Sequence, residues 1–118
     1  MRLGFVGTGT MGAPMAGCLI DAGHQLTVYD IRPDTTAALC ARGARSAQDA
    51  AAVARESEVV FSSLPGPTEV ERAVLDPGSG ILVGLQQGGA YIDMTTNASA
   101  VARGMKVEQP LQYVNFRD

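Results

Sequence analysis

The chain has no tryptophan, one histidine, one lysine and two cysteines among its 118 residues. Histidine and cysteine are so few and so scattered, with no CxxC pair, that we expect no zinc site. Cys18 and Cys40 are expected to be reduced thiols, and we place the protein in the cytoplasm. No apolar run approaches the ~18 residues that a membrane span requires. The net charge of −3, without a basic cluster, argues against nucleic-acid binding.

Glycine, in contrast, is abundant, with 14 residues, and three of them have the spacing Gly7-x-Gly9-x-x-Gly12. The motif directly follows an apolar run at residues 3–6 and precedes a helical pattern. Gly7 permits a tight turn, Gly9 lets the backbone approach a pyrophosphate, and Gly12 lets the helix pack closely on the strand. The helix N-terminus offers unpaired N–H groups to the anion. In this context the glycines predict a dinucleotide site.

An acidic residue stands close to the distance expected for an adenosine ribose contact. Asp30 lies 18 residues beyond Gly12, near the ~20 residues typical of the acid that accepts the ribose hydroxyls. A carboxylate there repels a 2′-phosphate, which favours NAD over NADP. Arg32 can instead pair with that phosphate or stack on adenine. A turn role for Asp30 and a solvated surface role for Arg32 remain the alternatives.

The rest of the pattern predicts an α/β fold, a Rossmann-type doubly wound parallel sheet in three αβα layers. We expect strands at residues 2–6, 25–30, 44–46, 58–64 and 90–94, and helices at 10–22, 33–42, 47–55, 68–75 and, in part, 81–86, with another starting near 97. This dinucleotide-binding domain is taken to span residues 1–103. A divergent tail at 104–118 has no clear period and is expected to be irregular or one edge strand.

Residues that follow the strands are the candidate ligand contacts, because ligands bind at the carboxyl ends of parallel strands. Thr8, Thr10 and Met11 belong to the glycine loop. Leu64-Pro65 follows the fourth strand and forms either an apolar ledge near a ribose or a plain turn. Thr95-Thr96 follows the last strand, where its hydroxyls can bond the nicotinamide ribose or a substrate carboxylate, or simply cap a helix.

Several longer stretches of the sequence are similar to the β-hydroxyacid dehydrogenases. This family includes 3-hydroxyisobutyrate dehydrogenase and tartronate semialdehyde reductase, and more distantly 6-phosphogluconate dehydrogenase. The matching stretches are GFVGTGTMGAPMA (4–16), VYDIRPD (28–34), SLP (63–65) and IDMTT (92–96). The resemblance covers about residues 1–103.

The resemblance implies hydride transfer between a small β-hydroxyacid and NAD, with NADP a less favoured cofactor. It assigns cofactor contacts to Gly7 through Gly12, Asp30, Leu64, Pro65, Glu69 and Thr96. It also places Thr95 and Thr96 beside the substrate carboxylate. The Asp-Ile-Arg sequence at 30–32 looks like that of the NAD-using members.

The sequence also departs from the family pattern. The family continues into an Asp-Ala-Pro-Val-Ser-Gly-Gly segment and a helical domain with a catalytic lysine, and neither follows here. Ser99 stands in place of an expected proline, and Lys106 lies outside any matching motif. We therefore expect cofactor binding without catalysis by this chain alone. The alternative is a stand-alone dinucleotide-binding or interaction module, whose tail docks on a partner or self-associates.

Overall fold

The computed structural model describes residues 1–8, 12–64, 67–93 and 113–116. The strands are β1 (Arg2–Val6), β2 (Gln25–Tyr29), β3 (Arg45–Ser46), β4 (Val59–Ser62), β5 (Ala90–Asp93) and β6 (Tyr113–Phe116). The helices are α1 (Gly12–Asp21), α2 (Pro33–Ala41), α3 (Ala50–Arg55), α4 (Pro67–Leu75) and α5 (Ile81–Gly84).

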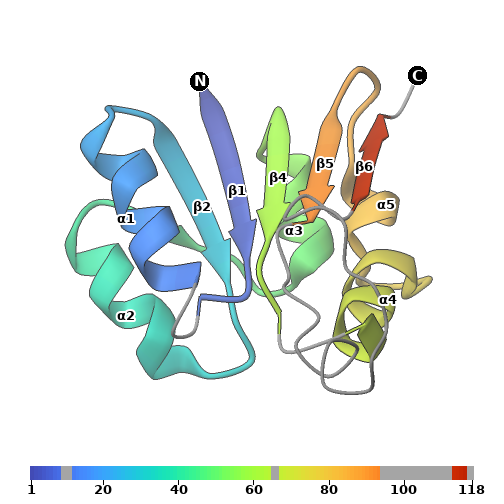
Figure 1. Ribbon diagram of the computed structural model, residues 1–118, viewed down its shortest axis with the longest axis horizontal. Helices are drawn as coiled ribbons and strands as arrows, with labels where there is room; N and C mark the ends of the chain where they lie inside the picture. The colour runs from blue at the N-terminus through green and yellow to red at the C-terminus, as the bar shows by residue number, and fades with distance from the viewer. Residues whose placement is uncertain (9–11, 65–66, 94–112, 117–118) are drawn as a thin grey trace, which may run out of the picture.

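The strands form one sheet in the order β3-β2-β1-β4-β5-β6 (Figure 1). Strands β1 to β5 are parallel, and β6 pairs antiparallel with β5. The chain thus moves from β1 to β3 in one direction, returns to the middle, and continues from β4 in the other. This reversal makes the sheet doubly wound, as the sequence predicts, and creates a switch point between β1 and β4.

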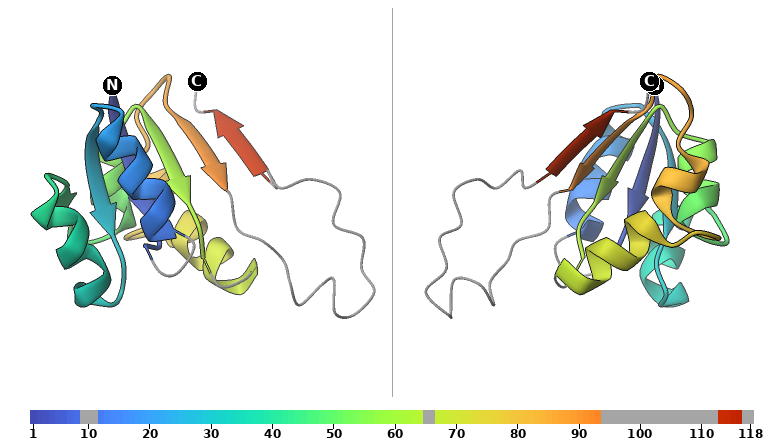
Figure 2. Two further views of the ribbon diagram at one scale, coloured as in Figure 1. Left: turned by 60° about the vertical axis from the view of Figure 1, so that its left-hand side comes forward. Right: turned by 90° about the vertical axis from the view of Figure 1, so that its right-hand side faces the viewer.

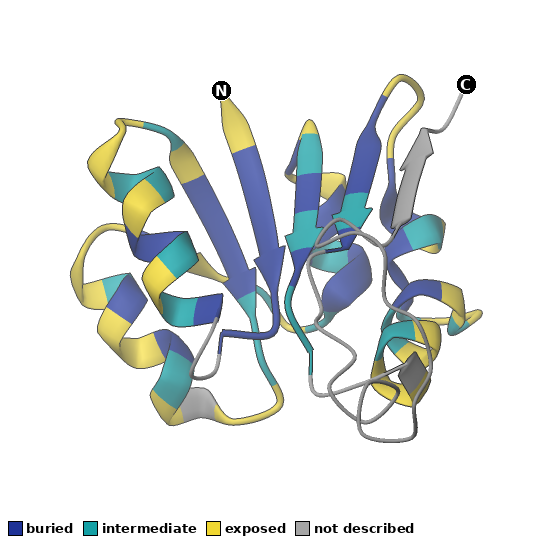
Figure 3. Ribbon diagram, viewed as in Figure 1, coloured by how far each residue is buried: buried dark blue, intermediate teal, exposed yellow. Residues whose placement is uncertain are grey.

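Helices cover both faces of the sheet (Figure 2). On one face, Leu3 and Phe5 of β1 pack with α1 and α2 in one apolar core. On the other face, Val6, Val60 and Tyr91 pack with α3, α4 and α5 in a second core. The central strands β1 and β2 are accordingly buried along most of their length (Figure 3). Burial on both faces explains why β1 and β4 are continuous apolar runs in the sequence.

The α3 helix starts later than the sequence analysis placed it. Residue 47 was the expected first residue, but α3 begins at Ala50. The cause is Asp49, whose side chain accepts a hydrogen bond of 2.8 Å from the Ala52 N–H. Because this is the geometry of an N-cap, the residues before Asp49 lie outside the helix.

The strands are also shorter than expected at their carboxyl ends. The strand predicted at 58–64 is β4, Val59–Ser62, and the strand predicted at 25–30 ends at Tyr29. The segments beyond them leave the sheet and form the edge of a cavity. The helix expected near 97 and the first nine residues of the tail, 104–112, lie outside the described residues.

Within the described part of the chain, no helix has the length and apolarity needed to cross a membrane.

Candidate functional site

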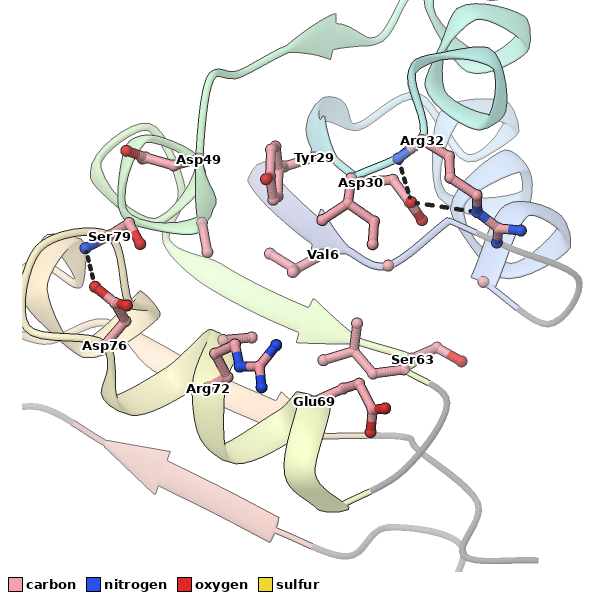
Figure 4. Close-up of a pocket in the computed structure, with 16 residues that line it drawn as sticks. Val6, Tyr29, Asp30, Arg32, Asp49, Ser63, Glu69, Arg72, Asp76 and Ser79 are labelled. Carbon is pink, nitrogen blue, oxygen red and sulfur yellow. Dashed lines mark hydrogen bonds and ion pairs between the residues drawn. The ribbon is translucent and has the colours of Figure 1, made fainter.

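A cavity of about 600 Å³ lies at the carboxyl ends of the central strands, beside the switch point (Figure 4). Its walls come from the ends of β1, β2 and β4 and from the facing sides of α3 and α4. The lining residues are Val6, Gly7, Gly12, Tyr29, Asp30, Ile31, Arg32, Asp49, Ala50, Ser63, Leu64, Glu69, Arg72, Ala73, Asp76 and Ser79. Six of the twelve residues predicted to bind cofactor are in this set: Gly7, Gly12, Asp30, Arg32, Leu64 and Glu69. The cavity therefore joins segments that are far apart in the sequence.

The carboxylate of Asp30 is fixed in place beside the glycine loop. Its Oδ2 accepts a hydrogen bond of 2.7 Å from the Thr8 N–H, and its Oδ1 accepts one of 2.9 Å from the Arg32 N–H. The Asp30 side chain is only 8% exposed, whereas that of Arg32 is 64% exposed, with its Nε 3.8 Å from Oδ1. A carboxylate has about four acceptor positions. Asp30 is thus held rigidly and keeps acceptor capacity for further donors.

Thr8 is buried, and its hydroxyl points toward α2. Its Oγ1 donates to Thr35 Oγ1 at 3.1 Å, and Thr35 Oγ1 donates to the Arg32 carbonyl at 2.8 Å. This chain of hydroxyls ties the glycine loop to the turn that carries Asp30 and Arg32. Thr8 therefore braces the loop in this structure, and its contact with a cofactor stays a prediction.

Two glycines of the motif are required by close backbone contacts. Gly7 has φ +87°, and a Cβ there would lie 2.3 Å from the Ser63 carbonyl oxygen. A Cβ on Gly12 would lie 2.1 Å from the Gly7 carbonyl oxygen. Only glycine lets the loop turn this sharply while α1 begins directly against it. Gly9, Thr10 and Met11, also predicted contacts, lie outside the described residues.

The wall formed by α4 contains residues that the sequence analysis missed. Glu69, the predicted contact, is followed at helical spacing by Arg72 and Ala73 of α4 and by Asp76, the first residue after α4, and all three line the cavity. Residues three and four apart lie on one face of a helix. This spacing from Glu69 was the available signal. Pro65, Thr95 and Thr96 of the predicted site lie outside the described residues.

The end of the cavity that is lined by Asp76 and Ser79 lies beside a close contact between α3 and α5. The Ala51 N–H donates to the Ser79 carbonyl at 2.9 Å. A Cβ on Gly84 of α5 would lie 2.0 Å from the Ala51 carbonyl oxygen, so α3 and α5 touch backbone to backbone. This contact fixes the loop that carries Asp76 and Ser79.

Asp76 gives this end of the cavity a fixed negative charge. The N–H groups of Gly78 and Ser79 donate to its Oδ1 at 2.8 and 2.9 Å. These bonds favour the ionised form and hold the pKa of the Asp76 carboxyl below its usual value.

The lowered pKa makes the contribution of Asp76 to stability depend on pH. The contribution is fully present above the unfolded-state pKa, about 3.9. It is lost as the pH falls through the lower folded-state pKa, because the protonated acid no longer attracts the N–H groups. We expect Asp76→Asn to be less stable than the wild type at pH 7 and this difference to narrow below about pH 3.9. Urea unfolding across this range measures it, with Asp34→Asn as the control, and an equal difference at every pH would contradict it.

Among the residues that the structure describes, no group of three or more histidine, cysteine, aspartate or glutamate side chains could hold a metal ion.

The chain matches, over residues 2–116, the protein family described as the NAD binding domain of 6-phosphogluconate dehydrogenase. It is 42% identical over 101 residues to the probable 3-hydroxyisobutyrate dehydrogenase-like 1, mitochondrial, of Arabidopsis thaliana, covering 86% of this chain and 30% of that protein. It is 37% identical over 101 residues to the 3-hydroxyisobutyrate dehydrogenase of Pseudomonas aeruginosa, covering 86% of this chain and 34% of that protein. The chain thus spans about a third of the length of these relatives.

Two solved structures are also similar to this chain. The 3-hydroxyisobutyrate dehydrogenase of Mycobacterium tuberculosis with L-serine superposes with a TM-score of 0.75 at 29% identity, over 88% of this chain and 38% of that one. Psf3 in complex with NADP+ and 2-OPP superposes with a TM-score of 0.75 at 28% identity, over 86% of this chain and 36% of that one. The matched part is in each case a minor share of the larger protein.

Proposed function

This chain belongs to the family of the NAD binding domain of 6-phosphogluconate dehydrogenase, and we propose that its cavity is where the dinucleotide lies. It is the NAD-binding domain of an oxidoreductase of the 3-hydroxyisobutyrate dehydrogenase type. The position of Asp30 is the main observation that supports this cofactor site. Its carboxylate lies at the carboxyl end of β2, is bonded to the glycine loop, and shares one cavity with Gly7 and Gly12.

The geometry supports a specific placement of the adenosine half. The ribose hydroxyls donate to Asp30, whose two oxygens are oriented by the Thr8 and Arg32 N–H groups. The pyrophosphate lies over Gly7 and the start of α1, where unpaired N–H groups and the helix dipole favour an anion. The adenine ring then enters the part of the cavity between the β2 end and the α4 wall.

Charge at the β2 end supports NAD as the preferred form of the cofactor. A 2′-phosphate on the ribose would lie against the buried carboxylate of Asp30, which repels it. Arg32 works in the opposite direction, but its side chain is largely exposed to solvent and its charge is screened there. We therefore propose that NAD binds more tightly and that NADP remains a weaker ligand.

For a complete protein containing this domain, we propose hydride transfer between a small β-hydroxyacid and NAD. The contribution of this domain is to hold the nicotinamide over the ends of β4 and β5, where the hydride is exchanged with the substrate carbon. The small hydroxyls of Thr95 and Thr96 are proposed to border the substrate carboxylate, as the family resemblance implies.

Calorimetric titration of the purified chain tests the cofactor proposal. We expect NAD+ to bind, ADP to compete with it, and NADP+ to bind about tenfold more weakly, a difference of about 1.4 kcal/mol. Equal or tighter binding of NADP+ would show that Arg32 outweighs Asp30. The absence of binding by either dinucleotide would contradict the proposed site.

A further inference from the structure

The carboxylate of Asp30 is held by hydrogen bonds from two separate segments of the chain. The Thr8 N–H, in the glycine loop, donates to Oδ2 at 2.7 Å. The Arg32 N–H, after β2, donates to Oδ1 at 2.9 Å (Figure 4). Each oxygen thus has one backbone donor from the protein. Because a carboxylate has about four acceptor positions, each oxygen also keeps capacity for a donor from a ligand.

The orientation of this carboxylate depends on how the two segments lie relative to each other. The sheet joins them as far as Gly7, whose N–H donates to the Tyr29 carbonyl at 2.9 Å. The strands themselves end at Val6 and Tyr29, so Asp30 and its donors lie beyond the last residues of the sheet. A contact outside the sheet must therefore fix the loop against the turn after β2.

Thr35, in the first turn of α2, supplies such a contact. Its Oγ1 accepts a hydrogen bond from the Thr8 hydroxyl at 3.1 Å and donates to the Arg32 carbonyl at 2.8 Å. The Thr35 N–H donates to the same carbonyl at 3.2 Å. Together with the two bonds to Asp30, these bonds form a closed ring through the four residues.

Burial and capping both make the ring depend on the Thr35 hydroxyl. Thr8 is 1% exposed, so water has little access to its hydroxyl, and Thr35 is the partner that satisfies it. Arg32 is the N-cap residue of α2 and makes no side-chain cap bond. The bonds from Thr35 to the Arg32 carbonyl therefore hold the start of this helix, and with it the turn that contains Asp30.

We propose that Thr35 is a positioning residue for the adenosine ribose of the cofactor. Through Thr8 and Arg32 it holds the Asp30 carboxylate in the orientation in which both oxygens accept from the 2′- and 3′-hydroxyls at once. Thr35 is not among the residues that line the cavity, so it acts on the ribose through Asp30. The inference rests on the proposed function, because it requires the adenosine ribose to lie at Asp30.

The test uses two nucleotides that differ only in their ribose hydroxyls. ADP has both hydroxyls, whereas 2′,3′-dideoxy-ADP has neither and cannot donate to Asp30. We expect the wild type to bind ADP about 10- to 100-fold more tightly than the dideoxy nucleotide, because hydrogen bonds to a charged group are the strong ones. Titrations of the whole chain, followed by the NMR shifts of its amides, give both dissociation constants even when binding is weak.

Thr35→Val removes the hydroxyl and keeps the size of the side chain. We expect ADP affinity to fall about tenfold and dideoxy-ADP affinity to change less than about threefold, so that the preference for ADP is largely lost. The change also leaves the buried Thr8 hydroxyl without this partner, which lowers thermal stability. The double variant of Thr8→Val with Thr35→Val removes both hydroxyls. It is expected to recover part of the stability and to keep the reduced preference for ADP.

Two further variants are the controls. Thr35→Ser retains a hydroxyl at the same position and is expected to show the wild-type ratio of ADP to dideoxy-ADP affinity. Ser57→Ala tests the effect of stability alone. Ser57 is buried and its hydroxyl donates to the Val53 carbonyl at 2.6 Å, but it precedes β4, on the side of the sheet away from the cavity. Its replacement is expected to lower thermal stability without changing the ratio.

The possible results distinguish this inference from the proposed function. If Thr35→Val prefers ADP as strongly as the wild type does, or loses affinity for both nucleotides equally, the positioning role is overturned while the cofactor site stands. A changed ratio in Ser57→Ala would overturn it as well. If the wild type itself binds the two nucleotides equally, or binds neither, the proposed ribose site at Asp30 fails first and the inference fails with it.

Discussion

Replacement of Gly7 by alanine is expected to abolish measurable NAD+ binding and to lower the free energy of unfolding by about 4 kcal/mol. The backbone of Gly7 has φ +87°, which L side chains rarely adopt, and a Cβ would lie 2.3 Å from the Ser63 carbonyl oxygen. A backbone oxygen cannot swing away as a flexible side chain can. The loop must move, and the pyrophosphate site moves with it.

Gly23→Ala is the control that isolates the steric contact. Gly23 also has a positive φ, +91°, but a Cβ there would meet no atom within 4 Å. Gly23→Ala should lower the free energy of unfolding only by the backbone strain, about 1–2 kcal/mol, and leave NAD+ binding unchanged. Urea unfolding and calorimetry on both variants measure the difference. Equal losses of stability, with NAD+ binding retained in both, would contradict the assigned role of Gly7.

Replacement of Asp30 by alanine is expected to weaken NAD+ binding by about 10- to 100-fold, because hydrogen bonds to a charged group contribute about 1.5–3 kcal/mol. The same change removes the charge that repels a 2′-phosphate and leaves Arg32 free to pair with it. NADP+ affinity should therefore be maintained or rise. The preference between the two cofactors is expected to reverse.

Two further variants separate the causes of this effect. Asp30→Asn keeps an oxygen that can accept from the Thr8 N–H, so it removes the charge while it preserves the brace on the loop. Asp34→Ala removes an exposed carboxylate on α2 that does not line the cavity. It should leave both affinities unchanged. Parallel losses of NAD+ and NADP+ binding in Asp30→Asn would show that Asp30 does not discriminate between them.

The parts of the site that the sequence predicts are those encoded in local spacing. The interval between Gly7 and Gly12 specifies a turn into a helix, and the position of Asp30 after an apolar run specifies a strand end. Both depend only on neighbouring residues. The alternation of strands and helices predicts a doubly wound parallel sheet, but the strand order β3-β2-β1-β4-β5 is known only from the structure. The late start of α3 was also encoded locally, in Asp49 before a run of alanines, but this cap was overlooked.

The remaining parts depend on contacts between distant segments. The hydroxyl of Thr8 meets that of Thr35 only because α2 packs against the glycine loop. The Ser62 hydroxyl of β4 donates to Asp93 Oδ1 of β5 at 2.9 Å only because the two strands pair in one particular register. No periodicity in a single segment contains this information, so packing alone determines these contacts.

The direction of β6 has a practical consequence for experiments on this protein. Because β6 is antiparallel to β5, it ends on the side of the sheet where β1 begins (Figure 1). The cavity lies on the opposite side, at the carboxyl ends of the parallel strands. A tether attached before β1 or directly after β6 would hold the protein by the side remote from its cavity. When the domain is immobilised on a sensor chip in this way, the cavity would face the flowing solution.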